Sequence, residues 1–147
     1  MIACRDNSLN IAKLLIDKGA DINIRYKGMT ALKASCINKE SIPCLRLLLN
    51  KGASPDEIVD EENEKTILHI ACEKENYEAI KQLLKYGAFI DPRTKGTWNE
   101  DKRRIENAYL TPLHISCIKG DFRAANYLLY NGADINASSI SNNINIY

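Results

Sequence analysis

Residues 111–136 read TPLHISCIKGDFRAANYLLYNGADIN, and this stretch decides the fold of the chain. It begins with a Thr-Pro-Leu-His phrase, and near its end stand two leucines, two spacer residues and Gly-Ala. From Thr111 to Gly132 the separation is 21 residues. Both phrases recur elsewhere in the chain, so we looked for an internal repeat before assigning secondary structure.

The closing phrase of two bulky apolar residues, two spacers and Gly-Ala occurs four times. Its copies span residues 15–20, 48–53, 83–88 and 128–133. Three of them follow a copy of the opening phrase, which begins at Thr30, Thr66 and Thr111. From each threonine to the following glycine the separations are 22, 21 and 21 residues. The unit between the two phrases is therefore nearly constant in length.

Each unit is expected to form two short amphipathic helices, because its apolar residues fall at helical spacing. A side-chain oxygen of the threonine can cap the first helix, and Pro112 suits a first helical position, where no amide donor is needed. Gly120 and Asn7 can adopt the left-handed conformation that ends the first helix. In the third unit the apolar positions are Leu68, Ala71, Cys72, Ala79, Ile80, Leu83 and Leu84.

The connections between units vary in length, unlike the units themselves. From each glycine to the next threonine there are 11, 14 and 24 residues. Surface loops tolerate such variation, because the entropy of loop closure grows slowly with length. The helices are therefore predicted to form a constant frame, and the loops to carry the differences.

These phrases resemble the signature of the ankyrin repeat family, Thr-Pro-Leu-His-x-Ala followed by Leu-Leu-x-x-Gly-Ala-Asp-x-Asn, over about 140 residues. The resemblance implies an all-α solenoid of about four stacked helix pairs, the first incomplete, with hairpin loops projecting between neighbours. It also implies protein–protein recognition. The boundaries we assign are repeats at residues 1–25, 26–57, 58–91 and 107–136, a long finger insertion at 92–106 and an Asn/Ser-rich tail at 137–147.

Two departures from the family pattern lead to further expectations. In the second unit Ala31 and Lys33 stand where the family prefers Pro and His, and one extra residue lies near Ser41-Ile42-Pro43, so this repeat is expected to be the most irregular. Neither end of the chain has an evident polar capping unit, which a repeat array normally needs. We therefore expect the chain to belong to a longer array or to stack on another molecule.

The cysteines and histidines fit structural roles. Four cysteines directly follow the Ala or Ser of the opening phrase, so Cys4, Cys36, Cys72 and Cys117 are expected to face the core, one per repeat, too far apart for disulfides. Cys44 is expected to be structural too. In the family, the histidine of the phrase, here His69 and His114, helps to tie neighbouring repeats by hydrogen bonds.

No arrangement typical of a nucleotide, metal or catalytic site is present, so neither a cofactor nor enzymatic activity is expected. The net charge of +1 argues against a nucleic-acid partner. No run approaches the ~20 apolar residues of a membrane span, and residues 1–6 lack the features of a signal peptide. An intracellular location, cytoplasmic or nuclear, is the resulting expectation.

The sequence predicts binding sites on the loops and on the first helices, where ankyrin proteins usually dock their partners. Trp98 is notable as the only tryptophan, in a long basic loop, because Trp and Arg dominate interface hot spots. The candidate contact residues are Arg25, Tyr26, Lys27, Ile37, Asn38, Lys74, Arg93, Trp98, Arg103, Arg104, Ile118 and Lys119. Alternatively, these charges are merely solvated, or the acidic connection at residues 55–65 pairs with the basic one beside it.

The family resemblance also implies that asparagines ending the Gly-Ala-Asp-x-Asn phrase can be hydroxylated, and Asn23 and Asn136 match that phrase. Two readings of function remain open at this stage. The first is a binding module, such as a scaffold or adaptor, for a protein partner. The second is a regulatory segment of a larger enzyme or channel.

Overall fold

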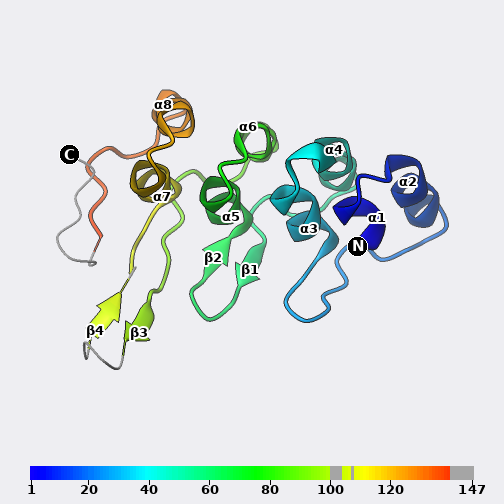
Figure 1. Cartoon of the computed structure of the whole chain (residues 1–147), viewed down its shortest axis with the longest axis horizontal. Coiled ribbons are helices and arrows are strands. Elements are labelled where there is room, and N and C mark those ends of the chain that lie inside the picture. Colours follow the sequence, from blue (N-terminus) through cyan, green and yellow to red (C-terminus); the bar gives the residue numbers. More distant parts are fainter. Residues whose placement is uncertain (100–103, 107, 140–147) are drawn as a thin grey trace.

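The computed structural model describes residues 1–99, 104–106 and 108–139, with the main chain alone for residues 97–99 and 104–106. Within these residues the chain forms a single row of helix pairs, with loops that project from one side of the row (Figure 1). The first helix of every pair packs on the first helix of the next pair, as α1 does on α3, α3 on α5 and α5 on α7. This architecture confirms the predicted solenoid.

The helices alternate along the chain as the repeated unit predicts. Between α3 and α4 lies one short 3-10 helix, η1. The first helices are α1 (Ile2–Arg5), α3 (Ala31–Ile37), α5 (Ile67–Glu73) and α7 (Pro112–Lys119), and the second helices are α2 (Leu9–Asp17), α4 (Ile42–Asn50), α6 (Tyr77–Lys85) and α8 (Phe122–Tyr130).

The third pair shows why the sequence folds in this way. The side chains of Leu68, Ala79, Ile80 and Leu83 are at most 1% exposed, and they occupy the positions that the helical spacing assigns to the core. Equivalent residues of the second and fourth pairs, such as Leu48 and Leu128, join the same continuous cluster. One apolar layer therefore runs through the stack between the two rows of helices.

The helix ends follow the predicted chemistry. Thr30 Oγ1 accepts a hydrogen bond from the Lys33 amide at 3.1 Å, and Thr111 Oγ1 accepts one from the His114 amide at 3.4 Å. Asn7, with a φ of 55°, follows α1, and Gly120, with a φ of 69°, follows α7, both in the left-handed region. The capping and termination predicted from sequence are confirmed at these positions.

The second pair is the irregular one, as predicted. The 3-10 helix η1 (Lys39–Ser41) lies between its two helices and accommodates the extra residue of this unit. Asn38 Oδ1 accepts a hydrogen bond from the Glu40 amide at 3.1 Å and so begins this turn. Pro43 then lies in the first turn of α4, where it leaves no hydrogen bond unmade.

Three connections project from the row as fingers. In the first, an isolated bridge pairs Tyr26 with Met29. The second contains the antiparallel strands β1 (Ile58–Asp60) and β2 (Lys65–Thr66), and the third contains β3 (Thr97–Asn99) and β4 (Arg104–Glu106). We call these connections finger 1 (residues 24–29), finger 2 (residues 54–66) and finger 3 (residues 89–110).

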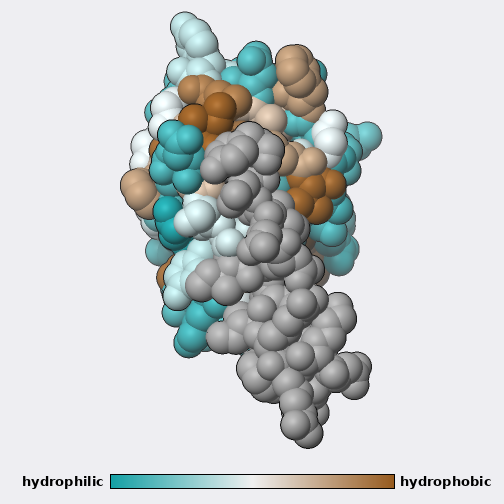
Figure 2. All heavy atoms as spheres, turned by 90° about the vertical axis from the view of Figure 1, so that its left-hand side faces the viewer, coloured by the Kyte–Doolittle hydropathy of each residue, from teal (hydrophilic) through white to brown (hydrophobic). Residues whose placement is uncertain are grey.

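One expectation, that Cys117 faces the core, is wrong at the end of the stack formed by α7 and α8. Cys4, Cys36, Cys44 and Cys72 are buried, but Cys117 is exposed. In the described part of the chain no further helix pair covers the outer side of α7 and α8. Large apolar side chains are exposed there as well, including Phe122 at 81% and Tyr130 at 88%. Figure 2 views this end and shows hydrophobic residues among hydrophilic ones.

Candidate protein-binding surface

The first helices present a row of side chains just after the core position of each repeat. We call this set the first-helix row, and within it Ile118 is 54% exposed whereas Ile37 is half-buried. Lys74 and Lys119 are also exposed, as the sequence predicts for contact residues. The row consists of Arg5, Asp6, Ile37, Asn38, Glu73, Lys74, Ile118 and Lys119.

Asn38 is engaged in holding the stack together. Its side-chain Nδ2 donates to the main-chain oxygen of Arg5 at 2.7 Å, which ties the first repeat to the second. Asn76 makes the corresponding link to the Cys36 oxygen, also at 2.7 Å. The sequence alone gave no signal for these two inter-repeat bonds, because an asparagine near a helix end is equally suited to local capping.

Finger 1 is a tight turn with an exposed aromatic side chain. Lys27 and Gly28 both have positive φ values, 50° and 70°, as the two central residues of a type I′ hairpin turn require. The ring of Tyr26 is 63% exposed, and Lys27 Nζ lies 5.5 Å from its centroid. Tyr26 and Lys27 therefore both lie at the surface, available to a partner.

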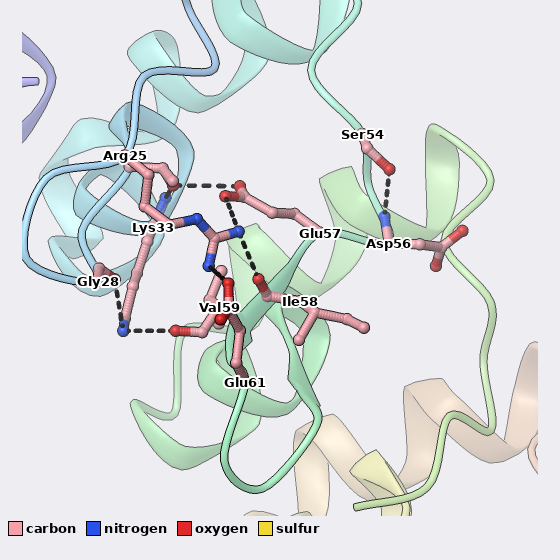
Figure 3. A network of polar contacts seen from close by, with 10 residues as sticks. Arg25, Gly28, Lys33, Ser54, Asp56, Glu57, Ile58, Val59 and Glu61 are labelled. Carbon is pink, nitrogen blue, oxygen red and sulfur yellow. Dashed lines mark hydrogen bonds and ion pairs between the residues drawn. The ribbon is translucent and has the colours of Figure 1, made fainter.

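Arg25 is held by finger 2 (Figure 3). Its guanidinium donates to Glu61 Oε1 at 3.1 Å and to the main-chain oxygen of Ile58 at 2.8 Å, and it lies 3.6 Å from Glu57 Oε1. Glu57 in turn accepts a hydrogen bond from Thr30 Oγ1 at 3.1 Å. Partial burial raises the pKa of the Glu57 carboxyl, against the effects of Thr30 and Arg25.

Lys33 also joins these two fingers. Its ammonium donates to the Val59 oxygen at 2.9 Å and to the Gly28 oxygen at 3.2 Å (Figure 3). Lys33 stands where the family places a histidine that ties neighbouring repeats. Although Lys33 departs from the family pattern, it still links two neighbouring repeats, because its long side chain reaches the Val59 oxygen on finger 2.

Several charges of finger 2 are paired within the chain. Besides the contacts to Arg25, Lys65 forms a 2.6 Å ion pair with Glu73, and Lys95 at the base of finger 3 lies 4.0 Å from Glu64. Of the alternatives open at the sequence level, pairing between adjacent fingers is therefore observed for Arg25 with Glu61 and for Lys95 with Glu64. Glu62 is exposed and forms no ion pair in the described part of the chain.

The base of finger 3 is anchored by Thr94, which is 1% exposed. Its side chain accepts a hydrogen bond from the Leu110 amide at 3.0 Å, and its own amide donates to the Leu110 oxygen at 3.1 Å. Arg93 is exposed, with one guanidinium nitrogen 3.4 Å from the Ser138 oxygen. The candidate side chains of Trp98, Arg103 and Arg104 lie outside the described residues.

An apolar pocket opens between α1 and α3. Its volume is about 190 Å³, and Met29 of finger 1 lines it together with Ile37 of the first-helix row. The remaining lining residues are Met1, Ile2, Arg5, Ala34 and Asn38. Ile2 is 69% exposed, so the pocket has an accessible apolar wall.

A polar groove lies on the other flank of α3, between finger 2 and α5. Its volume is about 460 Å³, and four carboxylates face three cations along it. The cations are Arg25, Lys33 and Lys65, whose contacts are described above. The carboxylates are Asp60, Glu61, Glu62 and Glu73. Burial tends to raise the pKa of the Asp60 carboxyl, but the hydrogen bonds from Asn63 together with the nearby charge of Lys65 lower it overall, so this group stays ionised.

The histidines and buried thiols show no arrangement suited to chemistry. Burial lowers the pKa of His69 to about 4 and raises that of Cys72 to about 12, which keeps both groups neutral at pH 7. Among the residues that the structure describes, no three His, Cys, Asp or Glu side chains are grouped to hold a metal ion. Likewise, no helix there has the length and apolar character needed to cross a bilayer.

The stacked helix pairs and projecting fingers define a solenoid repeat protein. A family model for ankyrin repeats, three copies long, matches residues 1–58 and 54–139. The chain belongs to the ankyrin repeat family. Members of this family are generally protein–protein interaction modules without catalytic activity.

Proteins from a virus, an insect and a human are similar to parts of this chain. Ankyrin repeat protein 14 of vaccinia virus (strain Western Reserve) is 31% identical over 109 residues, which cover 74% of this chain and 44% of that protein. The transient receptor potential channel pyrexia of Drosophila melanogaster is 37% identical over 100 residues, covering 66% of this chain and 10% of the channel. Human ankyrin repeat and SOCS box protein 16 is 32% identical over 90 residues, which cover 61% of this chain and 19% of that protein. The chain thus matches less than half of each relative's length.

Proposed function

We propose that this chain is a non-catalytic binding module that recognises one partner protein through the first-helix row and the tips of its fingers. The single observation that carries this proposal is the contrast between a fixed frame and a varied surface. Hydrogen bonds such as those of Asn38, Asn76 and Lys33 hold neighbouring repeats together. The exposed side chains, by contrast, differ from repeat to repeat.

Exposed side chains of three kinds lie on this surface. Tyr26 provides an aromatic ring, Ile118 an apolar side chain and Lys74 a cation, and each is accessible to solvent. Tyrosine is among the residues that contribute most to interfaces. By contrast, the buried histidines and thiols are neutral and enclosed, as expected of side chains that serve the fold.

An intracellular location, cytoplasmic or nuclear, and a scaffold or adaptor role form part of this proposal. The thiols of Cys36 and Cys72 are unpaired, which suits a reducing compartment. The proposed partner is a protein, with neither nucleic acid nor a membrane as the target. The chain would act within a longer repeat array, for which the exposed apolar side chains of α2 and α8 and the greater length of its relatives provide support.

A second function is favoured by two of the relatives. Pyrexia is a channel, and hecd-1 of Caenorhabditis elegans is an E3 ubiquitin-protein ligase of which the chain covers 4%. In each, the matching repeats are a small part of a large protein. Under this alternative, the chain would be a regulatory segment of an enzyme or channel. The genomic sequence that flanks the coding region distinguishes the two: a catalytic or membrane domain encoded in frame supports the alternative.

Affinity purification followed by quantitative mass spectrometry tests the binding proposal. The wild-type chain is compared with a finger 3 variant, Trp98→Ala combined with Arg103→Glu and Arg104→Glu, and with a matched variant that carries Ile118→Gln on the first-helix row. We expect a protein recovered by wild type that is depleted by at least one variant and that binds the purified chain directly. Recovery unaffected by either variant would contradict the proposed surface.

A further inference from the structure

The apolar pocket between α1 and α3 and the polar groove beyond α3 flank the same helix. The pocket is lined from the side of α1 by Ile2 and Arg5, and the groove from the side of α5 by Ile70 and Glu73. Because α3 packs against both α1 and α5, the two hollows lie on its opposite sides. A partner segment that crosses α3 would reach both.

The pocket has the size and lining for one large apolar side chain. Its volume of about 190 Å³ exceeds the ~150 Å³ of a cavity that holds a benzene-sized molecule. Met1, Ile2, Met29 and Ile37 supply the apolar walls. The charged side chain at its rim, Arg5, is paired with Asp6 at 2.7 Å, so its charge is compensated within the chain.

The groove has the charge to hold a cation. Its three basic side chains are all engaged: Arg25 on Glu61, Lys65 on Glu73 and Lys33 on two main-chain oxygens. Glu62, an exposed carboxylate of the lining, forms no ion pair among the described residues, and the lining holds four carboxylates against three cations. An incoming Lys or Arg would therefore gain attraction there, whereas an acidic side chain would be repelled.

On the basis of the proposed function, we propose that the partner presents a short extended segment that places a large apolar side chain (Leu, Met or Phe) in the α1–α3 pocket and a Lys or Arg in the groove. One helix diameter, ~10 Å, separates the two flanks of α3. An extended chain advances ~3.3 Å per residue, so the two side chains stand about three positions apart. The occupant is a basic, amphipathic peptide segment of another protein.

Selection from a phage-displayed library of random twelve-residue peptides, on the immobilised chain, tests this inference. We expect the selected peptides to share a large apolar residue and a basic residue about three positions apart. A synthetic peptide of the selected consensus is then measured by fluorescence anisotropy. Two substitutions at exposed sites probe the two hollows without disturbing the core: Ile2→Gln for the pocket and Glu62→Lys for the groove.

Each substitution has a matched control. Ile11→Gln makes the same change at an exposed isoleucine of α2, outside both hollows and outside the proposed binding surface, and Glu75→Lys makes the same charge change at an exposed glutamate between α5 and α6. We expect Ile2→Gln to weaken binding about tenfold and Glu62→Lys about two- to fivefold, with the controls unchanged. Circular dichroism establishes that all four variants keep their helical content.

Two results would overturn the inference. In the first, peptides bind but respond to neither Ile2→Gln nor Glu62→Lys, which places their site elsewhere on the chain and leaves the proposed function standing. In the second, no apolar–basic pair is enriched. The partner purification described above then decides the proposed function separately, because a folded partner that contacts the fingers would still be recovered.

Discussion

The imidazole of His69 joins two repeats, since its Nε2 lies 3.0 Å from the main-chain oxygen of Leu110 and its Nδ1 lies 3.1 Å from the Thr66 amide nitrogen. The Thr66 amide can only donate, so Nδ1 accepts and Nε2 carries the hydrogen. The neutral ring thus satisfies both neighbours. His114 repeats the local contact to Thr111, but its buried Nε2 has no hydrogen bond of standard geometry in the described part of the chain.

Acid should destabilise the fold through His69. Burial lowers the pKa of His69 in the folded state to about 4, from 6.5 when exposed. Between these two values the unfolded state binds the proton and the folded state does not, so the free energy of unfolding falls as the pH falls. From pH 7 to pH 5 we expect a loss of about 2 kcal/mol from this residue, measured by urea denaturation.

The variant His69→Gln isolates that contribution. Glutamine does not titrate, so the loss of stability between pH 7 and pH 5 should shrink by about 2 kcal/mol relative to wild type. His114, with its pKa lowered mainly by burial, and Glu57, with its pKa raised by burial, act in both proteins and cancel in the comparison. Equal pH dependence in the two proteins would show that His69 is not held neutral by the stack.

Truncating a core side chain of the helix pair α5 and α6 should strongly destabilise the fold. Leu83 is 0% exposed, so Leu83→Ala removes a fully packed side chain and leaves a cavity. We expect the free energy of unfolding to fall by about 2–5 kcal/mol. Leu14 on α2 is 57% exposed and serves as the matched control, with an expected change below about 1 kcal/mol for Leu14→Ala. Similar losses at both positions would be inconsistent with the described core.

Thiol labelling should distinguish Cys117 from the other cysteines. Cys4, Cys36, Cys44 and Cys72 are buried, and burial raises the pKa of Cys36 to about 12. At pH 8 we expect a chromogenic disulfide reagent to label one thiol rapidly in the folded chain and five in denaturant. A Cys117→Ser variant provides the control and should lack the fast phase. Rapid labelling of several thiols in the native protein would contradict the buried positions.

Hydroxylation of Asn23 and Asn136 remains a prediction from the family resemblance. The amide of each asparagine donates to the aspartate two residues earlier, at 2.8 Å for Asp21 and 2.9 Å for Asp134, and both asparagines are exposed. Treatment with an asparaginyl hydroxylase should add one oxygen at one or both sites, as measured by intact mass and fragment spectra. Asn23→Ala and Asn136→Ala serve as controls, and an unchanged mass of the wild-type chain would disprove the prediction.

The frame was predictable from sequence because its signals are local. The spacing of Leu68, Ile80 and Leu83 predicts their burial. Thr30 indicates a helix start by its capping oxygen, and Gly120 indicates a helix end because it adopts a positive φ without strain. The irregular second unit was also predictable, since an extra residue must be absorbed somewhere.

The inter-repeat contacts were less predictable, because they depend on distances between segments far apart in the sequence. Nothing local indicates that Lys33 reaches the Val59 oxygen, or that Asn38 reaches Arg5. The apolar pocket was missed for the same reason, although Ile37, which lines it, was among the candidate contact residues. The expectation for Cys117 was wrong because periodicity assumes a neighbour on both sides of every repeat.

Hydrogen–deuterium exchange of the chain with and without its purified partner tests the central claim most directly. The account predicts slower exchange on binding in finger 1, finger 2 and the first helices α3 and α5, with little change in the second helices α4 and α6. Protection confined to α4 and α6, with the fingers and first helices unchanged, would contradict it.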